Sequence, residues 1–304
     1  MVDITHKITT LRTAVAQAIV KVGSSETIQA VLDKKVPKGD VFEVSRVAGL
    51  FAVKNTSSVI PDCHPIPIEF TGIHFECLEN SIKIEVTVKT IYKTGVEVEA
   101  MHGASIVALT MYDMLQPIDK NVEISTVKLL HKKGGKSDYT TKQNLNLNVA
   151  VLVCSDSVSS GKKEDIAGEK IVGKLEKLGL TISKHTVIPD EIEIIQNNIN
   201  QLCEYKTDLI ILTGGTGLSN KDVTPEAIIP LIDRRIPGIE EAIRSYGQER
   251  TPFAMLSRSV VGFKGETLLM ALPGSTNGAA ESIDAVFPSV LHLFQLLNGF
   301  DHGK

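Results

Sequence analysis

The order of hydrophobic and polar positions changes near the middle of this 304-residue chain. From residue 149 onward, short apolar runs alternate with amphipathic stretches of helical periodicity. Strands are expected at 149–154, 181–188 and 208–213, and helices at 166–179 and 191–204. This alternation predicts an α/β three-layer domain in which helices cover both faces of a mostly parallel sheet.

The first half follows a different pattern. Apolar and polar residues alternate over 81–89, as expected for a strand with one face on the core and the other in water. Such strands are typical of antiparallel sheets. Helices are expected at 40–55 and at 97–115, and the second of them should end before Pro117. The first half is therefore predicted to be an α+β domain.

A polar, glycine-containing stretch without an apolar period, residues 132–148, separates the two patterns. At about 150 residues per domain, the chain is long enough for two domains. The predicted organisation is a first domain over 1–138, a linker over 139–148 and a second domain over 149–304.

Composition narrows the class of protein. The net charge of −4 indicates no general affinity for nucleic acid. The four cysteines form no CxxC pair, so neither a zinc ribbon nor a disulfide framework is indicated. The N-terminus has no apolar signal region, and no apolar run approaches the ~20 residues of a membrane span. We expect a cytoplasmic protein without a nucleic-acid or membrane partner.

A glycine loop follows the strand 208–213. The run Gly214–Gly217 is followed by Asp222 and by a helix that is expected to start with Thr224 as its N-cap. Backbone N–H groups of such a loop can approach an anion closely, and a carboxylate beside a phosphate-sized anion usually means that Mg²⁺ lies between them. The same residues also fit a tight turn in which Asp222 only caps the helix. The loop lacks the spacing of a dinucleotide or Walker A motif.

Other loops also follow predicted strands. They are residues 155–161 (SDSVSSG), 188–190 (IPD) and 272–276 (LPGST). Because the carboxyl ends of parallel strands meet at one edge of a sheet, these loops and the glycine loop can share one crevice.

These loops, together with DVTPE and LSRSV, resemble the molybdopterin adenylyltransferase family over about residues 147–299. The resemblance implies that molybdopterin is adenylylated with ATP and that Mg²⁺ is the cofactor. It implies a metal role for Asp190 and Asp222, with Asp222 also catalytic. The substrate-binding residues that it implies are Ser155, Asp156, Gly214, Gly215, Thr216, Gly217, Pro273, Gly274 and Ser275.

Short segments of the first half carry a second set of chemical groups. The segments are 37–42 (PKGDVF), 60–67 (IPDCHPIP), 95–100 (GVEVEA), 111–115 (MYDML) and 129–138 (LLHKKGGKSD). His64 lies in a proline-rich and therefore rigid stretch, although a single histidine is more often structural. Glu99 and Asp113 are expected on one helix face, either as solvated charges or as groups for acid/base chemistry. The lysines around Gly134 fit either a polyanion clamp or a basic linker.

Together these segments resemble the cyclic pyranopterin monophosphate synthase family over about residues 2–138. The resemblance implies a ferredoxin-like fold and the conversion of a cyclised GTP intermediate to cyclic pyranopterin monophosphate, with loss of pyrophosphate. It implies that Asp113 is the acid/base and that Lys38 and Lys132 are catalytic or bind the triphosphate. The substrate-binding residues that it implies are Arg12, Cys63, His64, Glu97, Val98 and Glu99.

The two resemblances predict a fusion of two enzymes of molybdenum cofactor biosynthesis that act at non-adjacent steps. The synthase family forms hexamers and the adenylyltransferase family forms trimers. Both assemblies contain a three-fold axis, so we expect a homo-hexamer or a trimer.

One position departs from the synthase pattern. The family has a lysine three residues after the catalytic aspartate, where this chain has Gln116. Glutamine keeps a hydrogen-bond donor but loses the cation, so the first site is hypothesised to turn its substrate over slowly. One alternative is therefore an impaired first domain that serves as an oligomerisation scaffold. Another is a second domain that binds molybdopterin without adenylylating it.

Overall fold

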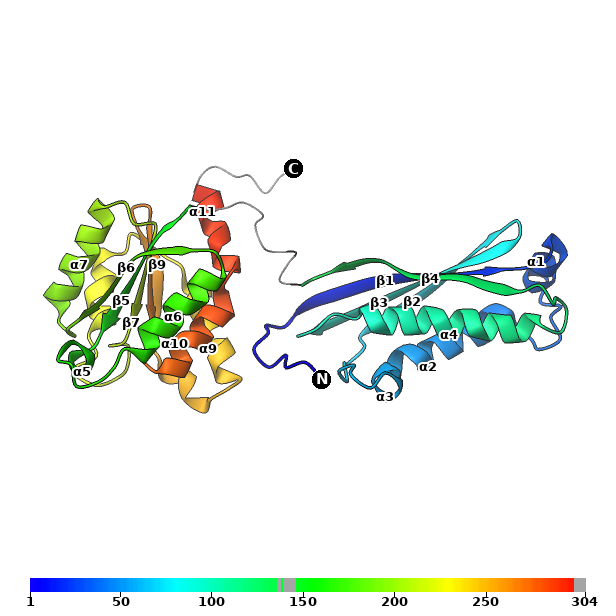
Figure 1. Cartoon of the computed structure of the whole chain (residues 1–304), viewed down its shortest axis with the longest axis horizontal. Helices are drawn as coiled ribbons and strands as arrows, with labels where there is room; N and C mark the ends of the chain where they lie inside the picture. The colour runs from blue at the N-terminus through cyan, green and yellow to red at the C-terminus, as the bar shows by residue number, and fades with distance from the viewer. Residues whose placement is uncertain (136–137, 139–145, 298–304) are drawn as a thin grey trace. The chain divides into compact units, whose positions relative to one another are not determined.

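The computed structural model describes residues 1–135, 138 and 146–297, and most of the predicted linker, 139–145, lies outside the described residues. The chain divides into two compact units, Met1–Asp138 and Tyr139–Lys304 (Figure 1). Each unit has a hydrophobic core of its own.

The first unit is an antiparallel sheet with the strand order β2-β3-β1-β4. Its strands are β1 (Thr10–Lys21), β2 (Phe70–Leu78), β3 (Ser81–Tyr92) and β4 (Glu123–Lys133). Its helices are α1 (Ser25–Leu32), α2 (Val41–Lys54), α3 (Thr56–Val59) and α4 (Glu97–Leu115). α2 and α4 pack against each other and against the sheet (Figure 1). The ferredoxin-like assignment of this unit stays a prediction.

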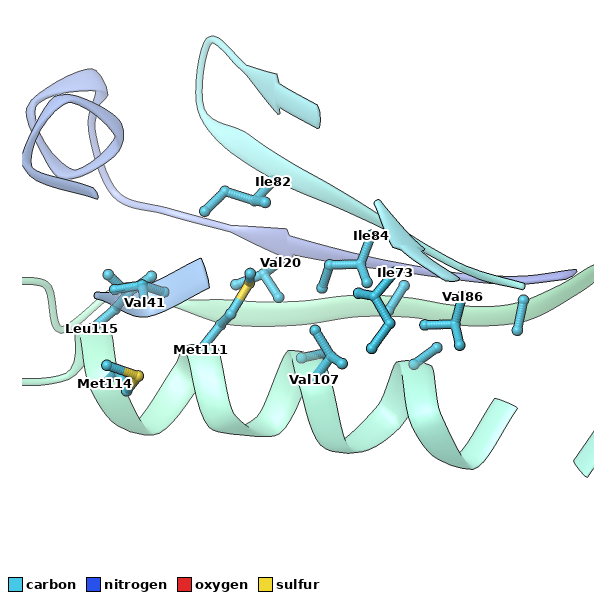
Figure 2. Close-up of a cluster of buried hydrophobic side chains, with 14 of the residues drawn as sticks. Val20, Val41, Ile73, Ile82, Ile84, Val86, Val107, Met111, Met114 and Leu115 are labelled. Carbon is cyan, nitrogen blue, oxygen red and sulfur yellow. The ribbon is translucent and has the colours of Figure 1, made fainter. Parts of the chain in front are cut away.

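The core of the first unit lies between the sheet and α4. Ile84 and Val86 of β3 point toward Val107 and Met111 of α4, and all four side chains are fully buried (Figure 2). The predicted alternation over 81–89 is confirmed, because the apolar positions of β3 are the buried ones. The opposite face of the same strand is less buried and carries its charged residues.

The second unit is a sheet with the strand order β6-β5-β7-β10-β9-β8. Its strands are β5 (Asn148–Cys154), β6 (Thr181–Ile188), β7 (Leu209–Thr213), β8 (Arg234–Arg235), β9 (Val260–Lys264) and β10 (Thr267–Leu272). β5, β6, β7 and β10 run parallel, whereas β8 and β9 are antiparallel to their neighbours. The predicted mostly parallel sheet is confirmed.

Helices cover both faces of this sheet, which makes three layers. The α-helices are α5 (Asp156–Ser159), α6 (Ile166–Lys177), α7 (Ile192–Glu204), α8 (Thr224–Ile228), α9 (Pro237–Gln248), α10 (Thr276–Val286) and α11 (His292–Leu297). Short 3₁₀ helices are η2 (Ile229–Leu231), η3 (Pro252–Leu256) and η4 (Ser289–Leu291). α6, α9 and α10 share one core cluster with the sheet, and α7 and α8 share the other.

The carboxyl ends of β5, β6, β7 and β10 lie along the same edge of the sheet, because these strands are parallel. The loops with the predicted chemical groups leave the sheet at this edge. Within the described ranges, no helix has the length and apolar character needed to cross a membrane.

Candidate functional sites

A cavity of about 560 Å³ lies at this edge of the second sheet, between the loops that follow β5, β6, β7 and β10. The predicted residues that line it are Ser155, Asp190, Gly214, Gly215, Asp222, Gly274 and Ser275. The structure therefore brings the four strand-end loops together around one cavity.

Gly214 sits where three of these loops touch. Its backbone has φ of +102°, a left-handed conformation that glycine adopts without strain. A Cβ at this position would collide with the carbonyl oxygen of Cys154, at the end of β5. A Cβ on Gly274, after β10, would lie 2.9 Å from the Cα of Gly214. The glycines thus allow the backbones of three loops to pack directly on one another.

Asp190 is a half-buried carboxylate of the cavity. Its Oδ2 accepts a hydrogen bond from the N–H of Asp156 (3.3 Å), and its own N–H donates to Asp156 Oδ1 (3.1 Å). Its Oδ1 is buried and has no hydrogen-bond partner among the described residues. Burial raises the pKa of Asp190 above its ordinary value, and the charges of Asp156 and Asp222 act in the same direction.

These residues fit a divalent cation of the magnesium type. The described residues contain no group of three histidines, cysteines or carboxylates that could hold a metal ion by itself. Mg²⁺ is instead commonly bound through one or two carboxylates together with substrate phosphates. Asp190 and Asp222 supply two carboxylates, and the unpartnered Oδ1 of Asp190 offers an oxygen that a cation would satisfy.

The helix after the glycine loop begins differently from the expectation. Val223, not Thr224, is the N-cap of α8, and no side chain caps that helix. Asp222 is not a cap either, because its Oδ2 accepts from the N–H of Ser219 at 2.8 Å. The predicted Thr224 cap is wrong, and so is the Asp222 helix cap of the alternative, whereas the tight turn of that alternative is present between Ser219 and Asp222.

Some of the predicted residues lie beside the cavity rather than in its lining. Asp156 pairs with Asp190 as described, and Thr216 is buried. Gly217 packs so closely that a Cβ on it would lie 2.8 Å from Asp222 Oδ2. These three residues therefore shape the loops that carry the carboxylates.

A second cavity of about 560 Å³ lies between α9, α10 and η3. Arg244 and Arg250 line it, as does Pro273, which was predicted to bind substrate. Ser275 and Thr276 line both cavities, so the two meet at the start of α10. The sequence analysis missed the two arginines, because an arginine on an amphipathic helix gives the same pattern whether it faces water or a cavity.

The predicted residues of the first unit form two groups. One group is Lys38 and Asp113: the Lys38 Nζ donates to Asp113 Oδ1 (2.8 Å) and to the Asp113 carbonyl (2.9 Å). Both side chains are largely exposed. This contact holds the loop before α2 against the last turn of α4.

The other group lies at the first turn of α4. Lys132 of β4 donates to Glu97 Oε1 (2.8 Å), and both residues line a small cavity of about 80 Å³ together with Arg12. The guanidinium of Arg12 donates to the carbonyls of Tyr92 and Lys93, both at 3.2 Å.

Cys63 and Glu99 form a buried contact in the second group. The Cys63 thiol donates to Glu99 Oε1 (3.1 Å), whereas Glu99 Oε2 is buried without a partner among the described residues. Burial, and then the Glu99 carboxylate, raise the pKa of Cys63 to about 12, so the thiol is a hydrogen-bond donor and not a nucleophile at neutral pH. Burial likewise raises the pKa of Glu99. His64 Nε2 lies 2.8 Å from the Val2 carbonyl, and Val98 is exposed.

The two groups do not meet within one chain. Glu99 and Asp113 are fourteen positions apart on α4, which places them about 21 Å apart along the helix axis. Glu99 lies at the first turn of α4 and Asp113 at its last turn, so within one chain these two acids belong to separate groups.

Comparisons with known proteins agree with this division. Residues 1–135 match the family model described as "MoaC family", and residues 150–292 match the one described as "Probable molybdopterin binding domain". The "Molybdenum cofactor biosynthesis bifunctional protein" of Chlorobaculum tepidum is 37% identical over 302 residues, which cover 99% of this chain and 96% of that protein. The chain belongs to this bifunctional family.

Further relatives match the whole chain or its first unit. The protein of the same name from Synechococcus elongatus is 36% identical over 316 residues, which cover 100% of this chain and 99% of that protein. The "Cyclic pyranopterin monophosphate synthase" of Clostridium perfringens is 49% identical over 139 residues, which are 45% of this chain and 87% of that protein. The predicted fusion of two domains of molybdenum cofactor biosynthesis is thereby confirmed at the level of the family.

The raised pKa of Asp190 leads to a prediction about stability. Its folded-state pKa lies above the unfolded value, so the folded protein holds this proton more tightly and the ionised carboxylate destabilises it at neutral pH. Without divalent cations, Asp190→Asn should therefore raise the melting temperature of the second unit at pH 7. The gain should vanish as the pH falls toward 3.8, the ordinary value of the carboxyl. Thermal unfolding in EDTA as a function of pH measures this, and a variant that is less stable at pH 7 would contradict it.

Proposed function

We propose that the second unit adenylylates molybdopterin with ATP and Mg²⁺. The observation that carries this proposal is the buried, unpartnered Oδ1 of Asp190, in a glycine-lined cavity that Asp222 also lines. Two carboxylates in such a cavity suit a magnesium–nucleotide complex, whose phosphates supply further oxygen ligands. The family's place in molybdenum cofactor biosynthesis supports a pterin as the second substrate.

The reaction needs little from the protein beyond position and charge. An oxygen of the pterin phosphate attacks the α-phosphorus of ATP, and the bond from that phosphorus to pyrophosphate breaks. The attacking oxygen is already anionic, so no general base is required. Mg²⁺, when bound, neutralises charge on the nucleotide phosphates. The residues themselves hold both substrates in place and donate backbone N–H groups, which fits a cavity lining that is rich in Gly, Ser, Thr and Asp and also carries Lys163.

The two cavities of this unit suggest how the substrates divide. We assign the magnesium–nucleotide to the cavity of Asp190 and Asp222, and the pterin phosphate to the cavity of Arg244 and Arg250. The arginines supply cations, and the amino end of α10 offers N–H groups to phosphate. The boundary of the two cavities at the start of α10 is then the place of reaction.

The alternative for this unit is a module that binds molybdopterin without adenylylating it. Such a module gains nothing from two carboxylates close to an anion site, because they repel the pterin phosphate. Asp190 and Asp222 therefore favour the enzyme.

For the first unit we propose cyclic pyranopterin monophosphate synthase activity on a ferredoxin-like fold, with Asp113 as acid/base. The contact of Lys38 with Asp113 supports this proposal. Lys38 places a cation beside the aspartate, which the neutral side chain of Gln116 cannot do. The identity with the Clostridium perfringens synthase supports it as well. Both points weigh against the alternative of an impaired scaffold.

We infer that each synthase site is made by two copies of the chain. One copy supplies Lys38 and Asp113, and the other supplies Glu99 and Lys132, since about 21 Å of helix separates these groups within one chain. Between the two groups, α4 exposes the apolar side chains of Val98, Met101, Leu109 and Tyr112. We propose that copies pair along this stripe and that the assembly is a homo-hexamer, which combines two-fold pairs with a three-fold axis.

Removing the Asp222 charge tests the adenylyltransferase proposal. Asp222→Asn should keep the fold but lower the rate of adenylyl-molybdopterin formation by about 10²-fold or more, the scale on which a preorganised charge contact acts. The measurement is the rate of pyrophosphate release with molybdopterin and MgATP, with circular dichroism as the check on folding. Near-normal turnover by a folded variant would rule out the metal role of Asp222.

Mixing two inactive variants tests the shared synthase site. Asp113→Asn and Lys132→Ala should each lose synthase activity alone. When they are unfolded and refolded together, each mixed pair should regain one intact site, because one chain keeps Asp113 and the other keeps Lys132. The readout is conversion of the cyclised GTP intermediate. No regain of activity in mixed oligomers, or a monomeric mass by light scattering, would contradict a site made by two chains.

Adding the missing lysine tests whether Gln116 impairs the first site. Because Lys38 already contacts Asp113, we expect Gln116→Lys to change the single-turnover rate by less than ~10-fold, well below the 10²–10⁴-fold that one general acid–base group commonly contributes. A rise of that larger size would instead favour the hypothesis of an impaired site. Substrate affinity, measured alongside, separates a change in chemistry from a change in binding.

A further inference from the structure

The segment that carries Asp222 has little regular structure to hold it. Residues 214–223 lie between β7 and α8. α8 has 5 residues, and its N-cap, Val223, makes no side-chain capping bond. The Asp222 carboxylate accepts a hydrogen bond from the N–H of Ser219, which lies in the same segment. Contacts from another part of the chain must therefore fix the position of this segment relative to Asp190.

Arg258 makes such contacts. It lies between η3 and β9, far from the segment in sequence, and does not line the cavity of Asp190 and Asp222. Its Nε donates to the carbonyl of Gly217 (2.7 Å) and its Nη2 to the carbonyl of Asp222 (2.7 Å). Its backbone N–H donates to the carbonyl of Thr216 (3.1 Å).

The third nitrogen of the guanidinium, Nη1, also has a partner. Nη1 of Arg258 pairs with the Glu226 carboxylate, on the first turn of α8. One planar side chain thus joins the glycine loop, the Asp222 backbone and the start of α8. A guanidinium can do this because its N–H donors are fixed in one plane, whereas a lysine ammonium is a single point at the end of a flexible stem.

We propose that Arg258 is a positioning residue that fixes Asp222 against Asp190 for a magnesium–nucleotide. The inference rests on the proposed adenylyltransferase function and assigns to Arg258 a role outside the chemistry, since it acts only through the segment that it holds. Without the guanidinium, the segment keeps its internal turn through Ser219 and the backbone bond from residue 258 to Thr216, but loses the side-chain bonds to the carbonyls of Gly217 and Asp222. The distance between the two carboxylates would then vary, and the cation would bind more weakly.

Cation binding and segment mobility test the proposal without relying on turnover. Arg258→Lys in the full chain keeps the charge and loses the planar fork. We expect its Kd for Mn²⁺, titrated by electron paramagnetic resonance in the presence of ATP, to rise about 10–100-fold, the usual effect of changing a group that orients metal ligands. Backbone amides of residues 214–223 should exchange with deuterium faster, while those of β7 keep the wild-type rate.

A matched control is Arg234→Lys. Arg234 also donates to a backbone carbonyl, that of Gly265 (3.1 Å), but it lies on β8 away from the cavity. This variant should leave both readouts unchanged. Arg258→Gln serves as a second test variant with the same expected direction, in case the lysine variant does not fold.

The possible results are distinct. A folded Arg258→Lys protein with the wild-type Kd for Mn²⁺ and wild-type exchange over residues 214–223 would overturn the positioning role. Failure of the proposed function looks different: the wild-type protein would form no adenylyl-molybdopterin and bind no Mn²⁺. Weakened Mn²⁺ binding together with faster exchange of the segment, and with neither effect in Arg234→Lys, supports the role of Arg258.

Discussion

The close contact of three strand ends around Gly214 is the constraint on which the second unit depends. The backbone after β7 packs against the Cys154 carbonyl on one side and against Gly274 on the other, at distances that admit no side chain. This contact puts the loops after β5, β7 and β10 at the rim of one cavity. Close packing of the loops also buries Asp190, which gives its carboxylate an unpartnered oxygen and a raised pKa. The backbone contact thus creates the electrostatic property that a cation would use.

The first unit is governed by a different constraint, the length of α4. A helix of 19 residues keeps its two ends apart, so the proposed acid/base residue Asp113 and the proposed substrate-binding residue Glu99 do not converge in one chain. Each end has an ion pair of its own: Lys38 with Asp113, and Lys132 with Glu97. A second copy is the simplest way to join them. Oligomerisation would then be part of the catalytic arrangement and not an addition to it.

Most of the fold could be predicted from sequence, because the two halves have clear periodicities. The buried alternation of β3 and the parallel strands β5, β6 and β7 follow directly from apolar patterns. The residues of the second site were predictable as well, since parallel strands carry their loops to one edge. The sequence did not show how the loops are held in place. The failure of Thr224 to cap α8 and the contacts of Arg258 with Gly217 and Asp222 depend on three-dimensional positions that no short motif records.

The central claim is that this protein has two kinds of active site, one for each of its two units. It is tested most directly by incubating the purified full-length protein with the cyclised GTP intermediate in one reaction and with molybdopterin and MgATP in another, and by identifying the products of each by mass spectrometry. The account predicts cyclic pyranopterin monophosphate in the first reaction and adenylyl-molybdopterin in the second. Absence of either product from a folded, oligomeric preparation would contradict it.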